Sequence, residues 1–234
     1  MQALSIHEAL GANPYPGRGI LFGRSPSGQA VAAYFIMGRS QNSRNRLFVP
    51  DGEGLLTEIH DPAKLEDPSL ILYAPVKMFH RTLIVTNGDQ TDTIFDALKH
   101  GRSFESALRS RCFEPDAPNY TPRISGILEF GGGFSYRLSI LKADERQCCE
   151  RQFYEYELPQ PGVGHLIHTY RSDGQPLPPF DGEPKRVALP DGLDSIAEEL
   201  WESLAEDNRI SLFVREIDPK TLSAQTRIIN RFTR

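Results

Sequence analysis

The pattern of apolar and polar positions divides the chain into short strands and a few helices. Apolar runs bounded by turn residues predict a first hairpin from residues 20–22 and Ala30–Met37. Segments 70–76 and 82–85 are continuously apolar or β-branched, which is typical of strands buried on both faces, so we expect them at the centre of a sheet. Further strands are predicted at residues 124–130, 135–141, 152–158, 165–170, 210–214 and 227–232.

Helical periodicity marks a second set of segments. Residues 91–100 place Ile94, Phe95 and Leu98 on one face, and Gly101 follows as a helix terminator. A second helix is predicted over residues 104–111. The clearest helix covers residues 194–206, where an apolar stripe lies opposite acidic residues. Because strands and helices come in blocks rather than in βαβ alternation, the pattern favours an α+β fold with antiparallel sheets.

The rest of the chain is divided by its turn residues and its length. Residues 159–190 are dense in Pro, Gly and Asp-Gly steps, which predicts a loop-rich segment around one short strand, either a lid or an edge insertion. Residues 1–16 look like an N-terminal extension. The length of 234 residues lies within the range of one large domain, so we expect a single domain over 1–234.

Composition restricts the function classes. A formal net charge of -5 argues against a broad nucleic-acid surface, because such binding needs clustered positive charge. No apolar run reaches membrane-spanning length, and residues 1–11 lack the pattern of a signal peptide, so we expect no membrane association and a cytoplasmic location. The three cysteines, Cys112, Cys148 and Cys149, are expected to stay reduced.

Histidines and glycines give no strong signal for a cofactor. His165 and His168 would point to opposite faces of a strand, and neither a third ligand nor an H-E-x-x-H pattern accompanies them, so no metal is expected. Gly131, Gly132 and Gly133 lack the spacing of a dinucleotide fingerprint and lie between two strands, which favours a hairpin turn over a phosphate cradle.

Three polar segments are the candidates for chemistry. Residues 38–46 bring three arginines together with amides and hydroxyls directly after an apolar strand; arginine forks suit phosphate, although a solvated loop is an equally simple reading. Residues 87–93 open a helix, where free N–H groups can bind an anion, but Asp89 and Asp92 are also natural capping residues. Residues 121–124 place Arg123 beside a proline of fixed φ at a strand entry.

Taken in order, these segments resemble the archaeal-type inosine monophosphate cyclohydrolases. The resemblance rests on Ala33-Tyr34 leading to Gly38-Arg39-Ser40 and Asn45-Arg46, on Asn87-Gly88 with Thr91-Asp92-Thr93-Ile94, and on Thr121-Pro122-Arg123-Ile124, and it spans about residues 17–141. It implies a four-layer αββα sandwich of antiparallel sheets, N-terminal nucleophile hydrolase-like in fold. Those hydrolases use a processed residue at the chain start. Here the chain starts with Met1 and an extension, so no N-terminal nucleophile is expected.

The implied reaction closes 5-formamidoimidazole-4-carboxamide ribonucleotide to inosine monophosphate with loss of water, without a cofactor. The resemblance places Arg39, Tyr73 and Glu114 near the reacting ring, with Lys77 as a neighbouring base. Glu114 is expected to transfer protons, Tyr73 to hydrogen-bond the formyl oxygen and Arg39 to stabilise charge. The residues expected to bind the nucleotide are Ser40, Arg44, Asn45, Arg46, Asn87, Gly88, Thr91, Asp92 and Arg123, with Arg46 and Arg123 the first candidates for the phosphate.

Several alternatives remain open at this level. Asp116 competes with Glu114 for the catalytic position, because the two lie in the same proline-rich loop. Read without the resemblance, Glu114 is a solvated loop carboxylate and Tyr73 a core residue. Two other functions are a related amidohydrolase and a non-catalytic purine nucleotide-binding protein. A homo-oligomer is expected, because exposed sheet edges of such sandwiches often pair.

Overall fold

The computed structural model describes residues 2–64 and 72–233, which form two antiparallel sheets. The first sheet has the order β11-β10-β1-β2-β12-β13 and the second the order β3-β4-β5-β6-β7-β8-β9. The first sheet consists of β1 (Arg18–Arg24), β2 (Ala30–Met37), β10 (Val163–His168), β11 (Lys185–Ala188), β12 (Arg209–Ile217) and β13 (Ala224–Asn230). The second consists of β3 (Arg46–Asp51), β4 (Gly54–Ile59), β5 (Val76–Phe79), β6 (Thr82–Thr86), β7 (Arg123–Glu129), β8 (Ser135–Ala143) and β9 (Cys149–Tyr156).

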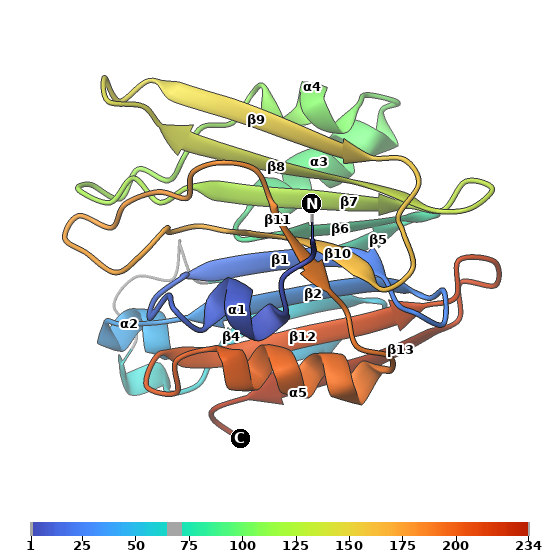
Figure 1. Cartoon of the computed structure of the whole chain (residues 1–234). Helices are drawn as coiled ribbons and strands as arrows, with labels where there is room; N and C mark the ends of the chain where they lie inside the picture. The colour runs from blue at the N-terminus through green and yellow to red at the C-terminus, as the bar shows by residue number, and fades with distance from the viewer. Residues whose placement is uncertain (1, 65–71, 234) are drawn as a thin grey trace.

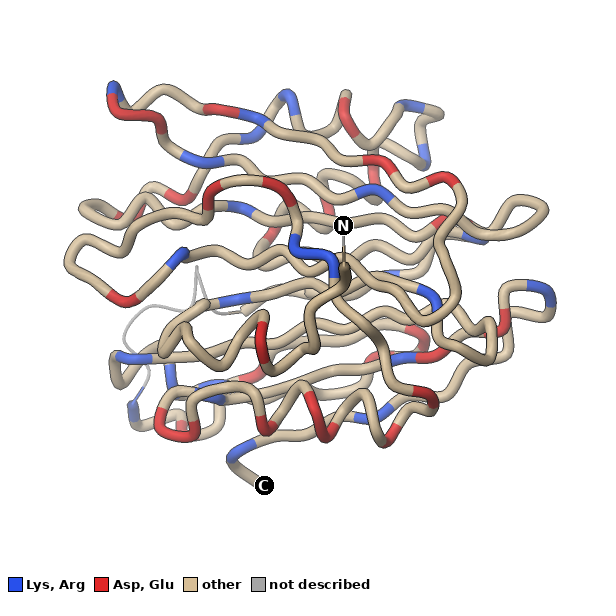
Figure 2. Tube along the Cα trace, in the orientation of Figure 1, with Lys and Arg blue, Asp and Glu red and all other residues tan. Residues whose placement is uncertain are grey.

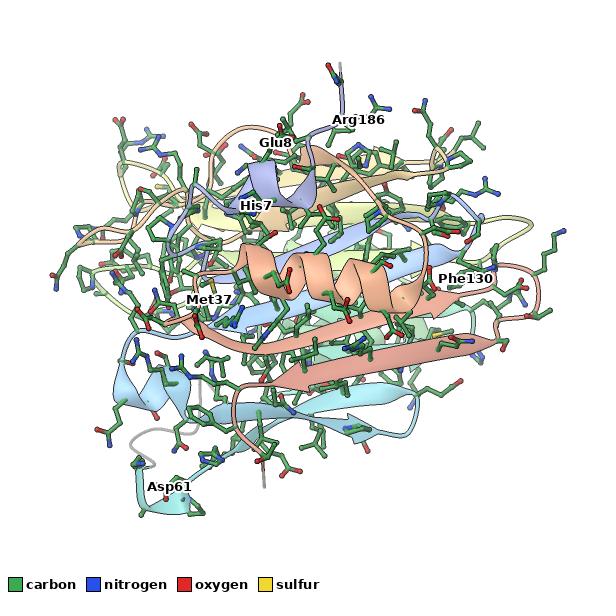
Figure 3. All side chains as sticks on the ribbon, turned by 60° about the horizontal axis from the view of Figure 1, so that its bottom comes forward. His7, Glu8, Met37, Asp61, Phe130 and Arg186 are labelled. Atoms are coloured by element: carbon green, nitrogen blue, oxygen red, sulfur yellow. The ribbon has the colours of Figure 1, made fainter. Side chains whose placement is uncertain are left out.

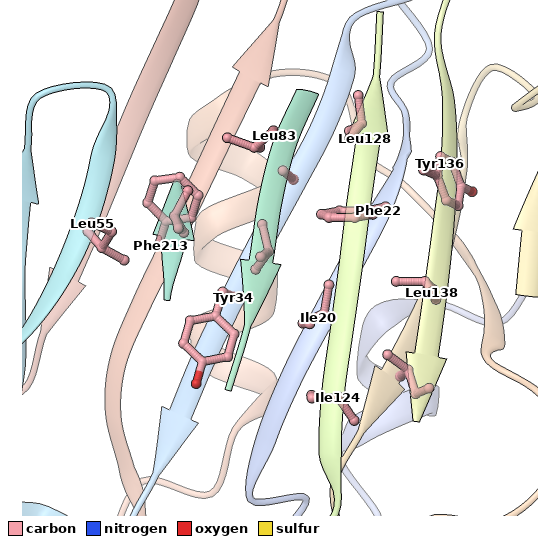
Figure 4. Close-up of a cluster of buried hydrophobic side chains, with 14 of the residues drawn as sticks. Ile20, Phe22, Tyr34, Leu55, Leu83, Ile124, Leu128, Tyr136, Leu138 and Phe213 are labelled. Carbon is pink, nitrogen blue, oxygen red and sulfur yellow. The ribbon is translucent and has the colours of Figure 1, made fainter. Parts of the chain in front are cut away.

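The two sheets pack face to face around the main apolar core. Phe22 and Tyr34 of the first sheet belong to one cluster with Leu128 and Leu138 of the second, and Figure 4 shows this cluster. Neighbouring residues such as Leu21 point to the opposite face of the first sheet, where they are buried in a second cluster. Burial on both faces explains why β1 and β2 read as continuous apolar runs rather than as alternating ones.

Helices cover the outer face of each sheet (Figure 1). Helix α5 (Leu193–Ser203) and the short α1 (Ile6–Leu10) pack on the first sheet, and α3 (Gln90–Lys99) and α4 (Phe104–Leu108) pack on the second. The remaining helical turns are α2 (Gln41–Arg44) and the 3₁₀ turn η1 (Pro62–Lys64). This arrangement confirms the expected α+β class with antiparallel sheets. None of the helices in the described part of the chain is long and apolar enough to cross a membrane.

Within the described residues, the prediction of a strand over residues 70–76 is wrong. Residues 70 and 71 lie outside the described residues, and residues 72–75 are irregular, so that β5 begins only at Val76 and continues to Phe79. Pro75 has no N–H to donate to a ladder, which delays the strand. The irregular segment is instead fixed beside β4, because the Tyr73 carbonyl accepts hydrogen bonds from the Thr57 N–H at 3.0 Å and from its hydroxyl at 2.9 Å.

The β3–β4 hairpin and helix α1 were not predicted, although each had a local signal; α2 and β11 were not predicted either. The β3–β4 hairpin turns at Gly52-Glu53, and Gly52 has a φ of 55°, the left-handed conformation that tight hairpin turns require and glycine favours. Helix α1 begins with a capping box between Ser5 and Glu8. It lies beside α5, as the labels of His7 and Glu8 in Figure 3 show, and its Leu10 is fully buried. The N-terminal segment is therefore part of the packed outer layer.

Candidate active site

A cavity of about 270 Å³ opens at the end of the sandwich where β1 begins and β2 ends. Loops that follow or precede buried core strands converge there, and Met37, labelled in Figure 3, ends β2 near this point. The cavity is lined by Tyr15, Arg18, Arg39, Ser40, Asn42, Ser43, Glu114, Asp116, Asn119, Thr121, Tyr170 and Leu177. Three of the residues selected from sequence, Arg39, Ser40 and Glu114, thus share one cavity wall.

Glu114 is the buried carboxylate of this cavity. Its residue is only 3% exposed, and its backbone N–H donates to the Thr121 carbonyl at 2.9 Å, which fixes the loop. Burial raises the pKa of Glu114, and the attraction of Arg18 and then Arg123 offsets this only in part. A raised pKa makes the ionised form of a carboxyl group a stronger base, which suits Glu114 to proton transfer.

Arg18 is the cationic counterpart of Glu114, and the sequence reasoning missed it. Burial alone would lower the pKa of Arg18, but the Glu114 carboxylate and nearby tyrosines outweigh it, so the guanidinium stays charged. Its Nε is shielded from solvent and has no hydrogen-bond partner among the described residues. The sequence signal nearest to Arg18 was the preceding Gly17. Its φ of 79° and its lack of a Cβ let the chain lie against Thr169.

A second buried cation, Arg46, lies behind this wall together with two tyrosines. Arg46 is fully buried; its Nε donates to the Ser43 carbonyl at 2.9 Å, whereas its Nη1 has no partner in the described structure. The hydroxyls of Tyr34 and Tyr73 are 2.7 Å apart. Burial lowers the pKa of Arg46, and the positive charge of Arg18 lowers it further, so Arg18 adds to the cost of keeping Arg46 charged.

Asp116 lines the same cavity, but both of its carboxylate oxygens already accept hydrogen bonds from Thr121. Its Oδ1 accepts from the Thr121 N–H at 2.6 Å, and its Oδ2 accepts from the Thr121 hydroxyl. The Glu114 carboxylate, by contrast, makes no side-chain hydrogen bond within residues 2–64 and 72–233. Of the two competing carboxylates, Asp116 therefore has a structural task, and Glu114 is the one left available for a ligand.

Arg39 stands at the rim of the cavity, held by the loop that follows β10. It forms an ion pair with Asp173, and its Nη1 also donates to the Gly174 carbonyl at 3.2 Å. Its guanidinium lies 4.8 Å from the centre of the Tyr15 ring, a cation–π contact. Leu177 of the same loop lines the cavity. Part of the segment 159–190, predicted as a lid or an edge insertion, thus borders the site.

The Asn87-Gly88 motif does not line the cavity, and its contacts hold neighbouring residues of the site in place. The Asn87 amide donates to the Pro122 carbonyl at 2.9 Å and accepts from the Ile124 N–H at 2.9 Å. A Cβ on Gly88 would lie 2.6 Å from Arg123 Nη1 and 3.6 Å from Glu114 Oε1, so glycine makes room for both. Arg123 Nη1 donates to Asp89 and to Gln90, at 2.7 Å each, and Thr91 bonds the Gly88 carbonyl at 3.1 Å.

Other residues selected from sequence lie away from the cavity. Arg44 donates to the Gly38 carbonyl at 3.0 Å and to Asn208 at 3.2 Å, and Asn45 bonds the backbone of Asp61 through two contacts of 2.7 Å. Lys77 forms an ion pair with Asp92 at 2.5 Å on the outer side of the second sheet, below α3. All four serve local structure at these positions.

Metal-ligating groups do not gather in the described parts of the chain, although the thiols of Cys112 and Cys149 lie close together. No group of three His, Cys, Asp or Glu residues is placed to hold a metal ion there. Cys112, Cys148 and Cys149 are free. Basic residues are spread over strands and loops with acidic ones between them, as Figure 2 shows.

Comparison with known proteins connects this geometry to a family. A family model described as IMP cyclohydrolase-like protein matches residues 15–221. The chain is 30% identical over 159 residues to the IMP cyclohydrolase of Methanopyrus kandleri, an alignment that covers 67% of this chain and 75% of the relative. It is 28% identical over 165 residues to that of Methanothrix thermoacetophila, covering 68% and 76%. For the IMP cyclohydrolase of Methanocaldococcus jannaschii the identity is 28% over 116 residues, covering 49% and 57%. The chain, with its buried arginine and carboxylate at one end of two stacked antiparallel sheets, belongs to the IMP cyclohydrolase-like protein family.

Proposed function

We propose that this protein closes the ring of 5-formamidoimidazole-4-carboxamide ribonucleotide to give inosine monophosphate and water. The observation that carries the proposal is the buried Glu114, with a raised pKa, beside an Arg18 whose Nε is unbonded among the described residues. A proton carrier and a stabiliser of developing negative charge are the two groups that this reaction needs. The family membership and the relatives named IMP cyclohydrolase support the same assignment.

The chemistry consists of one bond formed and one broken. The carboxamide nitrogen attacks the formyl carbon, negative charge develops on the formyl oxygen, and that oxygen then leaves as water. One hydrogen of the water comes from the carboxamide nitrogen and the other from the formamide nitrogen. We assign to Glu114 the transfer of the first proton, since its carboxyl group is buried and free of other side-chain hydrogen bonds in the described structure.

Charge stabilisation is assigned to the arginines and to Tyr73. The Tyr73 hydroxyl, held by Tyr34, is proposed to donate to the formyl oxygen. Arg18 and Arg39 line the cavity and supply positive charge, and Arg46 and Arg123 add to it from behind the wall. Burial of cations with unbonded nitrogens is costly, and an anionic nucleotide relieves that cost.

The fold is consistent with a finer assignment. We infer that the two sheets and their outer helices form the αββα sandwich of the N-terminal nucleophile hydrolase type, in one domain. The candidate groups Arg18, Tyr73 and Glu114 are internal residues, so the proposed chemistry uses no terminal nucleophile.

The test is to incubate the purified protein with the formamido ribonucleotide and to follow purine absorbance. Ring closure well above the uncatalysed rate is expected, and Glu114→Gln should reduce it by at least about 100-fold, the usual range for general acid–base catalysis. Glu202→Gln, on the exposed side of α5, serves as the matched control. Tight binding of inosine monophosphate without turnover would instead assign the chain to nucleotide binding alone.

A further inference from the structure

A second cavity lies at the opposite end of the sandwich. Strand β1 runs from Arg18 in the candidate active site to Arg24, which lines a cavity of about 820 Å³, here called the distal cavity. Strand β7 likewise runs from Arg123 to Glu129 at the distal cavity. At the usual rise per strand residue the two ends are separated by about 20 Å. Figure 1 shows the strands running the length of the molecule between these ends.

The basic groups of the distal cavity lack ionic partners. Arg24, Arg81 and Lys220 line it, and none of them forms an ion pair in the parts of the chain that are described. Arg24 lies 5.9 Å from the centre of the Phe134 ring, and its Nε is shielded from solvent and has no hydrogen-bond partner among the described residues. Arg81 is fixed by its Nε, which donates to the Phe130 carbonyl at 2.6 Å. Guanidiniums that form no ion pair of their own are suited to bind an anion.

Next to these cations lies the glycine turn between β7 and β8. Gly132 and Gly133 have φ of 83° and 149°, and a Cβ at either would meet nothing within 4 Å. The turn therefore needs glycine for its backbone conformation, whereas packing would leave room for a side chain. Because the space beside both glycines is open, a ligand in the distal cavity can approach the turn closely, as phosphates do in glycine-rich loops.

Acidic groups also line the distal cavity. Glu129 is neutralised by Arg137, whose Nη2 donates to it at 2.6 Å. Glu155 and Glu157 also line the cavity, and neither forms an ion pair among the described residues. Tyr154 and Tyr156 pack against the core between the sheets, so alternation along β9 places Glu155 on the outer side. Free carboxylates at such a rim accept hydrogen bonds from hydroxyl or amino groups.

We propose that the distal cavity is a second nucleotide site, which binds the phosphate of a nucleoside monophosphate through Arg24 and Arg81. The ribose hydroxyls face Glu155 and Glu157, and Phe134 provides an apolar wall for the base. The volume of about 820 Å³ falls within the range of roughly 300–1,000 Å³ common for small-molecule sites. This site goes beyond the proposed ring closure, because it shares no lining residue with the candidate active site.

The test measures nucleotide binding by calorimetry on the full chain, with adenosine monophosphate as the probe and adenosine and inorganic phosphate as comparisons. The double variant Arg24→Met, Arg81→Met should lose the distal binding event or weaken it at least tenfold. The matched control is Arg102→Met, Arg109→Met, which removes the same charge from two exposed arginines outside both cavities. Arg46→Met, aimed at the candidate active site, should leave the distal event unchanged.

Each outcome decides the proposal. Adenosine without phosphate should bind the distal cavity at least tenfold more weakly than its monophosphate, and inorganic phosphate more weakly than the whole nucleotide. Binding of adenosine monophosphate at one site only, unaffected by Arg24→Met, Arg81→Met, overturns the proposal. Equal losses in the control variant, or a changed oligomeric state with nucleotide binding intact, overturn it as well. Ring closure is assayed separately, so failure of the distal site leaves the proposed function untouched, and the reverse holds.

Discussion

The phenolic oxygens of Tyr34 and Tyr73 lie 2.7 Å apart, so a fully buried residue of β2 holds a residue of the segment before β5. Burial, followed by the neighbouring Tyr73, raises the pKa of Tyr34 well above its usual value, which keeps its phenol neutral. The Tyr34 ring also stacks on Phe48 at 5.5 Å, which fixes its position. Tyr34 therefore orients the hydroxyl of Tyr73, and neither tyrosine is among the residues that line the cavity.

Tyr34→Phe keeps the ring but removes this anchor. We expect turnover to fall by roughly 3- to 10-fold, because Tyr73 loses its orientation but keeps its hydroxyl, whereas Tyr73→Phe should cost on the order of 100-fold. Initial rates with the formamido ribonucleotide measure both. Tyr154→Phe, on β9 and away from the cavity, is the matched control. Unchanged rates in both test variants would remove the tyrosine pair from the mechanism.

Glu114→Gln should make the folded protein more stable at neutral pH while reducing its activity. Because the folded pKa of Glu114 is raised, the native state binds its proton more tightly than the unfolded chain does. Stability is therefore fully present below the unfolded pKa of about 4.3 and falls as pH rises through the folded pKa. Thermal unfolding at pH 4 and pH 8 measures this. The Tm advantage of the variant should appear only at pH 8, and a constant difference would contradict the raised pKa.

Asp116→Asn should affect stability more than chemistry. Asp116 accepts two hydrogen bonds from Thr121, and weakening such bonds to a charged group costs about 1.5–3 kcal/mol. We expect a lower free energy of unfolding in urea and a turnover within about threefold of the parent protein. A loss of turnover as large as that of Glu114→Gln would transfer the proton-transfer role to Asp116.

Arg18→Met should change the pH profile as well as the rate. The positive charge of Arg18 lowers the pKa of Glu114, so its removal raises that pKa further and moves the corresponding limb of the kcat/KM profile to higher pH. Arg18→Lys retains the charge and should restore the limb toward its original position. If the rate falls in Arg18→Met without any displacement of the limb, Arg18 acts only through binding.

Leu10→Ala tests whether the N-terminal segment supports the fold. Leu10 is fully buried beneath α5, and truncation of such a side chain costs about 2–5 kcal/mol. Urea unfolding measures the loss. Leu158→Ala, at a side chain that is 90% exposed, is the control and should be nearly neutral. Equal stability of the two variants would indicate a loosely attached segment.

Much of the fold follows from local pattern. Residues 30–37 and 82–86 are buried on both faces, so their continuous apolar composition predicted them correctly. Residues 72–75 have the same composition, yet Pro75 and the contact of Tyr73 with Thr57 interrupt the ladder. Apolar composition predicts burial. It does not predict the backbone hydrogen bonding that defines a strand, and in this segment that bonding is missing.

The candidate site was only partly predictable. Arg39 and Glu114 do meet at one cavity, whereas Lys77 and Asp92 pair on the outer side of a sheet. Side chains alternate between the two faces of β5, so the face on which Lys77 lies depends on where that strand begins. Arg18 was not predicted as a site residue, because a single arginine at the start of a strand has no distinctive spacing. Its position becomes informative only when antiparallel pairing brings the start of β1 to the same end as Glu114.

Strand β1 connects the two cavities, and its alternate side chains form a row on one face. Arg18, Ile20, Phe22 and Arg24 are separated by steps of two, so they share one face of β1, with two buried apolar residues between the guanidiniums. The separation of about 20 Å along β1, well beyond the Debye length of about 8 Å at physiological ionic strength, weakens the interaction between the two charges. A change of ligand at one end therefore has little direct effect on the charge at the other end, and the two ends are free to diverge separately in evolution.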